Sequence, residues 1–141
     1  MRSRGRLVLF VDDSQDARDL GEAVLNGRGF HVEQATDGVE AVEKAAVLLP
    51  DVIVMDFDMP AMNGGEAARR LASDERTRSI PVVMVSGAAE CVPREVRLGC
   101  AAFLVKPCPP EELATILHLI VAARGDTPSD PGLFDRPTPT E

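Results

Sequence analysis

The chain has 141 residues, of which 45% are hydrophobic and 27% charged, a balance typical of one globular domain and unlike that of a disordered chain. Its 23 acidic residues outnumber the 15 basic ones and give a net charge of -8, which argues against direct binding to nucleic acid or anionic lipid. No apolar run is long enough for a membrane span or a signal peptide, so we expect a cytoplasmic protein without membrane insertion.

Apolar runs and segments of helical period alternate through the first half of the chain. The run 6–11 predicts a strand, and 14–29 predicts a helix that Ser14 caps, with Leu20 and Val24 facing inward. Three further elements follow in order: a short strand at 30–35, a helix at 38–49 and a strand at 51–56.

Capping patterns mark the starts of two helices. Asp37 followed by Glu40 opens the helix at 38–49, and Asn63 followed by Glu66 opens one at 65–72. In such a capping box the first side chain accepts from a backbone N–H three residues later, and the acidic side chain reaches back.

The second half of the chain continues the alternation. It predicts a strand at 81–87, a short helix at 90–99, a strand at 101–106 and a last helix that begins at Pro109 and Pro110. Four apolar residues form the inward stripe of that last helix: Leu113, Ile116, Leu117 and Ile120.

Five strands that alternate with five helices predict an α/β domain with a parallel sheet covered by helices on both faces. The domain is expected to span residues 6–124. Residues 1–5 are expected to form a flexible head, and 125–141, rich in Pro, Asp and Thr, a disordered tail.

Polar residues stand at the carboxyl ends of the predicted strands, where ligands bind in an open parallel sheet. They are Asp12 and Asp13 after the first strand, Asp56 at the end of the third, Ser86 after the fourth and Lys106 after the fifth. Converging carboxylates repel each other unless a cation lies among them, and oxygen ligands suit Mg²⁺, or alternatively Mn²⁺. With such an ion, Ser86 and Lys106 are suited to hold phosphoryl oxygens, and Asp56 is the natural nucleophile.

Four motifs in this order, each at the end of a predicted strand, carry a resemblance to a known family. They are the acidic pair Asp12 and Asp13, "MDFDMPAMNG" around Asp56, "SG" at Ser86, and "FLVKP" ending at Lys106 and Pro107. Over residues 6–124 the chain resembles the response-regulator receiver domain of two-component signalling and phosphorelays.

The resemblance implies a flavodoxin-like doubly wound (βα)5 fold with strand order 2-1-3-4-5. It also implies a phosphorylation-dependent switch, a phosphoprotein that takes a phosphoryl group on Asp56 from a sensor histidine kinase or a phosphotransfer protein. Such a domain is not an enzyme in the usual sense, because it catalyses only its own phosphorylation and dephosphorylation.

The resemblance also implies roles for individual residues. Mg²⁺ would be held by Asp12, Asp13 and Asp56 together with the backbone carbonyl of Asp58, with Asp12 acting mainly through a coordinated water. Ser86 and Lys106 would contact the phosphoryl group, and the peptide before Pro107 would be cis. Phe103 matches the switch aromatic, which turns inward when the Ser86 hydroxyl moves toward the phosphate.

Two questions stay open at this point. The Asp58 side chain either tunes the phosphoryl lifetime, by positioning water or altering metal affinity, or is a solvated loop carboxylate. Pro93 stands where the fourth helix should begin, and proline fits only a first turn, so this helix should be short, late or displaced.

No output domain is recognisable after Arg124, so we expect a stand-alone receiver that binds a downstream protein or passes its phosphoryl group onward. A monomer or weak dimer is expected. The kinase is expected to dock on the first helix around Ser14, Gln15 and Arg18, by analogy with the fold.

Two other functions compete with this interpretation. A pseudo-receiver would keep the fold and act as a binding module without phosphorylation. A haloacid-dehalogenase-like phosphatase would use Asp56 as nucleophile and Asp58 as acid/base, but in that family the DxD strand comes before the acidic pair, and here it follows.

Overall fold

A computed structural model describes residues 6–60 and 62–124, so the expected head at 1–5 and tail at 125–141 lie outside the described residues. The strands are β1 (Arg6–Val11), β2 (Phe30–Ala35), β3 (Val52–Asp56), β4 (Val82–Ser86) and β5 (Ala102–Val105). The helices are α1 (Gln15–Asn26), α2 (Gly38–Leu48), α3 (Gly64–Ser73), the 3-10 turn η1 (Ala89–Cys91), α4 (Arg94–Leu98) and α5 (Pro110–Ala123).

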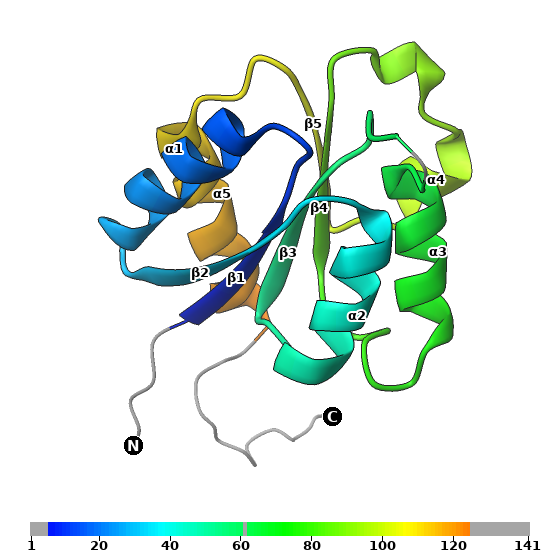
Figure 1. The fold of residues 1–141 in the computed structure, drawn as a ribbon, viewed down its shortest axis with the longest axis horizontal. Helices are drawn as coiled ribbons and strands as arrows, with labels where there is room; N and C mark the ends of the chain where they lie inside the picture. The colour runs from blue at the N-terminus through cyan, green and yellow to red at the C-terminus, as the bar shows by residue number, and fades with distance from the viewer. Residues whose placement is uncertain (1–5, 61, 125–141) are drawn as a thin grey trace.

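The strands form one parallel sheet in the order β2-β1-β3-β4-β5, which confirms the predicted flavodoxin-like doubly wound topology. Helices α1 and α5 lie together on one face, and α2, α3 and α4 lie on the other (Figure 1). Right-handed crossovers between parallel strands place the helices on these two faces.

Each face of the sheet has its own hydrophobic cluster. Leu9, Ile53 and Met84 belong to the cluster that also contains residues of α2, α3 and α4. Val8 and Val54 belong to the cluster that contains residues of α1 and α5. All five residues of β3 are buried because this central strand faces helices on both sides, which explains why its sequence shows no polar alternation.

The predicted capping residues act at the starts of α2 and α3. The side chain of Asp37 accepts from the Glu40 backbone N–H at 2.8 Å, and that of Asn63 accepts from the Glu66 backbone N–H at 3.0 Å. The Glu40 carboxylate, however, accepts from the backbone N–H and hydroxyl of Thr36 and not from the N–H of Asp37. The return bond of the capping box therefore reaches one residue further back than expected.

Helix α1 is turned differently from the prediction. Leu20 was expected to face inward, but it is 56% exposed, whereas Arg18, Gly21 and Leu25 are buried. Gly21 explains this orientation, because a Cβ atom there would lie 2.6 Å from the Phe10 ring. The helix therefore rests on β1 through a residue without a side chain.

The fourth helix is short, as the position of Pro93 predicts. Pro93 is the residue immediately before α4, which has only five residues, and η1 precedes both. Only Val96 of α4 is buried, so this helix contributes little to the core.

Gly64 allows α3 to begin directly against the end of β3. Its backbone N–H donates to the Phe57 carbonyl at 3.1 Å, and a Cβ atom there would lie 2.8 Å from the backbone oxygen of Asp56.

We expect Gly64→Ala to lower the free energy of unfolding by about 1–3 kcal/mol in urea titrations, since the backbone in contact cannot give way. Gly27→Ala is the matched control, because Gly27 has ordinary helical φ and an added Cβ atom would make only ordinary contacts, 3.5 and 3.7 Å from backbone oxygens. Equal stability of the two variants would contradict the expectation.

Candidate functional site

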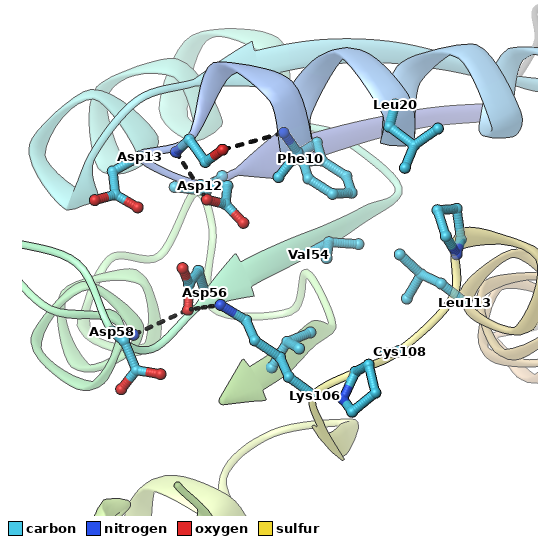
Figure 2. A pocket seen from close by; sticks show the side chains of 16 residues that line it. Phe10, Asp12, Asp13, Leu20, Val54, Asp56, Asp58, Lys106, Cys108 and Leu113 are labelled. Atoms are coloured by element: carbon cyan, nitrogen blue, oxygen red, sulfur yellow. Dashed lines mark hydrogen bonds and ion pairs between the residues drawn. The ribbon is translucent and has the colours of Figure 1, made fainter. Parts of the chain in front are cut away.

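Three carboxylates gather at the edge of the sheet where the strands end. Val11 of β1 pairs with Met55 of β3, so Asp12 and Asp56 are the next residues on two neighbouring strands. Oxygen atoms of Asp12, Asp13 and Asp56 all lie within 4.8 Å of one another (Figure 2). The structure thus brings together the acidic residues that the sequence singled out.

Asp56 is buried at the centre of this group and is only 4% exposed. Its Oδ1 accepts from the backbone N–H of Asp58 at 3.0 Å and pairs with Nζ of Lys106 at 3.2 Å (Figure 2). Burial raises the pKa of the Asp56 carboxyl, and the charge of Asp12 adds to this, whereas the Asp58 N–H and Lys106 lower it. The balance leaves the pKa above its ordinary value, chiefly because burial disfavours the ionised form.

Asp12 is held from three directions. Its backbone N–H donates to the Ala35 carbonyl at 3.2 Å, and its Oδ1 accepts from the Ser14 N–H at 2.9 Å. Its backbone carbonyl accepts from the guanidinium of Arg18 at 2.7 Å. Asp12 is 9% exposed, while Asp13, the next residue, is exposed at the mouth of the site.

Ser86 lies at the end of β4 and is fully buried. Its hydroxyl donates to Oδ2 of Asp58 at 3.2 Å, and the Gly87 N–H donates to the same oxygen at 3.1 Å. The sequence did not predict this contact, although it places Asp58 and Ser86 after neighbouring strands. The Asp58 side chain is therefore engaged with the two donors at the end of β4.

Lys106 follows β5, and its side chain extends over Asp56 (Figure 2). Its backbone N–H donates to the Ser86 carbonyl at 2.9 Å, which fixes the chain beside β4. The peptide between Lys106 and Pro107 is cis, as the resemblance implied. The lysine side chain stays 40% exposed, so its ammonium is solvated as well as paired.

Phe103 lies in β5, away from the carboxylates. It pairs in register with Met84, while Ser86 pairs with Val105. Its ring packs against the cluster on the α2, α3 and α4 face, and the guanidinium carbon of Arg97 lies 5.8 Å from the ring centroid. The structure places Phe103 on the same two strands as Ser86, two register positions earlier.

A cavity of about 740 Å³ opens over the carboxylates. One end is polar, with the acidic residues and Lys106, and the other is apolar, between α1 and α5. Figure 2 shows Phe10, Leu20, Val54 and Leu113 around this apolar end. The exposed Leu20 side chain thus lines the cavity instead of the core.

The donor set fits a hard divalent cation. Asp12, Asp13 and Asp56 offer only oxygen atoms, at one solvent-accessible point, and Mg²⁺ binds through one or two carboxylates while it retains water.

No helix in the described parts, 6–60 and 62–124, is long and apolar enough to cross a membrane.

A model of the response regulator receiver domain matches residues 8–118, and the chain belongs to this family of two-component signalling domains. The chemotaxis protein CheY of Thermotoga maritima is 33% identical over 117 residues, which are 82% of this chain and 98% of that protein. The DNA-binding regulator RpaA of Synechocystis is also 33% identical, over 75% of this chain but only 45% of the longer relative.

Solved structures agree with this assignment. CheY4 of Vibrio cholerae superposes with a TM-score of 0.74 at 32% identity, over 83% of this chain and 99% of that one. The receiver domain of the sensor histidine kinase PA1611 of Pseudomonas aeruginosa, solved with magnesium coordinated in its active-site cleft, superposes with a TM-score of 0.77 at 30% identity, over 84% and 99%.

Proposed function

We propose that this chain is a phosphorylation-dependent signalling switch that accepts a phosphoryl group on Asp56 from a sensor histidine kinase or a phosphotransfer protein. The observation that carries the proposal is the meeting of three carboxylates within 4.8 Å of one another, with the Lys106 ammonium 3.2 Å from Asp56. A cation held beside a buried carboxylate and two further acidic groups is suited to a chemistry that places additional negative charge among them.

In the proposed reaction, a carboxylate oxygen of Asp56 attacks the phosphorus of a phosphohistidine. The new P–O bond forms as the P–N bond breaks, and the electron pair of that bond leaves with the imidazole nitrogen. Lys106 pairs with the transferred group, and the Ser86 hydroxyl donates to one of its oxygens. Asp56 becomes an acyl phosphate, which water later hydrolyses.

The proposed metal ligands are the carboxylates of Asp12, Asp13 and Asp56 and the backbone carbonyl of Asp58. Mg²⁺, or Mn²⁺ in its place, would supply charge neutralisation for the incoming phosphoryl group. Asp12 would act mainly through a coordinated water. The magnesium in the cleft of the related PA1611 receiver domain supports this assignment.

Ser86 and Phe103 form the proposed switch. When the Ser86 hydroxyl moves toward the phosphoryl group, it vacates space at the end of β4, and Phe103 turns inward from β5. The pairing of Ser86 with Val105 and of Met84 with Phe103 provides a short mechanical path between them.

The proposed partners are proteins. The phosphoryl donor docks beside Ser14 and Gln15 at the start of α1, where the exposed Leu20 side chain adds an apolar contact. Arg18, expected in the same docking surface, is only 8% exposed and does not belong to it. A monomer or weak dimer then binds a downstream target in the cytoplasm, without direct contact to nucleic acid.

The decisive test is incubation with Mg²⁺ and a small acyl phosphate or phosphoramidate, followed by mass spectrometry of the intact protein and its peptides. We expect one phosphoryl group per chain, on Asp56. No labelling by any donor, despite bound Mg²⁺, would instead favour a binding module that works without phosphorylation. Release of many equivalents from a phosphate monoester would favour a phosphatase.

Magnesium itself should stabilise the fold. A ligand that binds only the native state at ten times its dissociation constant adds about 1.4 kcal/mol to the free energy of unfolding. We therefore expect Mg²⁺ to raise the melting temperature of the wild type, and not that of Asp13→Asn. KCl at equal ionic strength is the control, because screening alone relieves part of the repulsion among the carboxylates. An equal rise in KCl would count against a metal site.

A further inference from the structure

Arg18 is a buried cation in α1, where Asp16 and Asp19 are exposed and Glu22 is half-buried. It lies in α1 and is 8% exposed, and it forms no ion pair with any carboxylate of residues 6–60 and 62–124. Burial of a guanidinium is costly unless its donors are satisfied, so its contacts must compensate for lost hydration.

Both contacts of Arg18 are to neutral oxygens beside the acidic site. One terminal nitrogen donates to the backbone carbonyl of Asp12 at 2.7 Å, and Nε donates to Oε1 of Gln34 at 2.9 Å. Gln34 lies in β2, next to β1 in the sheet, and its Nε2 donates to Glu22 at 2.6 Å. The guanidinium is therefore held in one orientation by β1, β2 and α1 together.

The carbonyl of Asp12 belongs to the peptide group that joins Asp12 to Asp13. A hydrogen bond to that oxygen fixes the plane of the peptide, and with it the direction in which both side chains leave the backbone. Their carboxylates lie within 4.8 Å of each other and of Asp56, so mutual repulsion favours their separation. Arg18 opposes that separation through the backbone.

We propose that Arg18 is a positioning residue for the divalent-metal site. Its hydrogen bond to the Asp12 carbonyl fixes the orientation of the Asp12–Asp13 peptide and thereby the two carboxylates. The inference rests on the proposed function, because it assumes that Asp12 and Asp13 bind Mg²⁺. Arg18 acts from the interior of the domain, so this is not a docking role. Its effect comes from the hydrogen-bond geometry and not from its positive charge.

Calorimetric titration with Mg²⁺ alone tests the proposal, and the chain has no Trp or Tyr whose fluorescence would serve instead. We expect Arg18→Met to weaken Mg²⁺ affinity about tenfold or more, as loss of outer-shell support does in other metal sites. Arg18→Lys keeps the charge but lacks the planar fork, so it should also lose affinity. If charge were the cause, Arg18→Met would bind Mg²⁺ more tightly, since a repelling cation would be gone.

Gln34→Leu is the second variant. It leaves Arg18 and its charge in place but removes the acceptor that orients the guanidinium, so we expect an intermediate loss of affinity. It also keeps the proposal testable if Arg18→Met does not fold. Arg69→Met is the matched control, because Arg69 is an exposed helical arginine whose side chain is 58% exposed and pairs with Glu66.

Amide NMR without metal separates positioning from general stability. Arg18→Met and Gln34→Leu should shift the Asp13 and Ser14 amide signals far more than those of β4 and β5. Unchanged Mg²⁺ affinity in Arg18→Met and Gln34→Leu, with normal binding by the wild type, would overturn the role of Arg18 and leave the proposed function standing. Absence of Mg²⁺ binding by the folded wild type would overturn both.

Discussion

Asp56→Asn is expected to abolish phosphoryl acceptance while making the metal-free protein more stable. The amide oxygen still accepts from the Asp58 N–H, so the local hydrogen bond survives, but the amide cannot form an acyl phosphate. Mass spectrometry after incubation with a small phosphoryl donor should show full labelling of the wild type and none of the variant. Labelling of the variant at another residue would contradict the assignment of Asp56.

Asp56→Asn is expected to increase stability, although it abolishes phosphoryl acceptance, because burial raises the pKa of Asp56. The native state keeps its proton to higher pH than the unfolded chain, so the wild type loses stability as the pH rises between the two pKa values. We expect the variant's advantage to be smallest below the unfolded value of about 3.9 and largest above the raised native value. A gain of about 1 kcal/mol would appear as a rise of roughly 4 °C in melting temperature at pH 7.

Mg²⁺ should remove this advantage. A bound ion would neutralise the carboxylates of the wild type, whereas the variant would offer it one carboxylate fewer. At pH 7 the variant should melt at a higher temperature than the wild type without Mg²⁺. With Mg²⁺ the difference between the two melting temperatures should vanish or change sign. If Asp56→Asn lowers the melting temperature without metal at every pH, then ionisation of the buried carboxylate does not destabilise the native state, contrary to this expectation.

Asp58→Asn is expected to speed acyl phosphate formation about tenfold, which corresponds to about 1.4 kcal/mol in the barrier. In the structure the Asp58 carboxylate accepts from the Ser86 hydroxyl and the Gly87 N–H. Ser86 is one of the groups proposed to receive a phosphoryl oxygen. In the proposed reaction the carboxylate would have to withdraw before a phosphoryl oxygen could accept from Ser86, and its charge would also repel the incoming anion.

The rate is measured by quenched mass spectrometry with one small donor at fixed Mg²⁺. Asp74→Asn is the control, because Asp74 is an acidic residue at the far end of α3 that pairs with Arg76. Equal rates for wild type and Asp58→Asn would show that the contact does not delay phosphorylation. Hydrolysis of the acyl phosphate is followed in the same samples, and equal lifetimes would remove any role of Asp58 in dephosphorylation.

Much of the fold and the grouping of the acidic residues could be predicted because parallel sheets impose them. Parallel strands end at the same edge of the sheet. Asp12, Asp56 and Ser86 could therefore be placed together once their strands were identified. The prediction needed only element order and the last residue of each strand. It did not depend on how any helix was rotated.

Contacts that depend on helix rotation could not be predicted in the same way. Periodicity favoured Leu20 for the inner face of α1, but the absence of a side chain at Gly21 turned the helix so that Arg18 faces inward. A charged residue is rarely chosen as buried, so Arg18 was placed on the surface. The contact between Asp58 and Ser86 was missed because loop side chains are not set by strand register.

The proposed phosphorylation site and the proposed switch residue Phe103 lie toward opposite faces of the sheet. The cavity over Asp56 extends between α1 and α5, whereas Phe103 packs on the other face of the sheet, against the cluster that contains residues of α2, α3 and α4. A phosphoryl donor that docks at the cavity, as proposed, would leave the face of Phe103 uncovered. If the donor docks as proposed beside α1 and the target binds on the face of Phe103, the two partners would occupy opposite faces of the sheet and would not compete for the same residues.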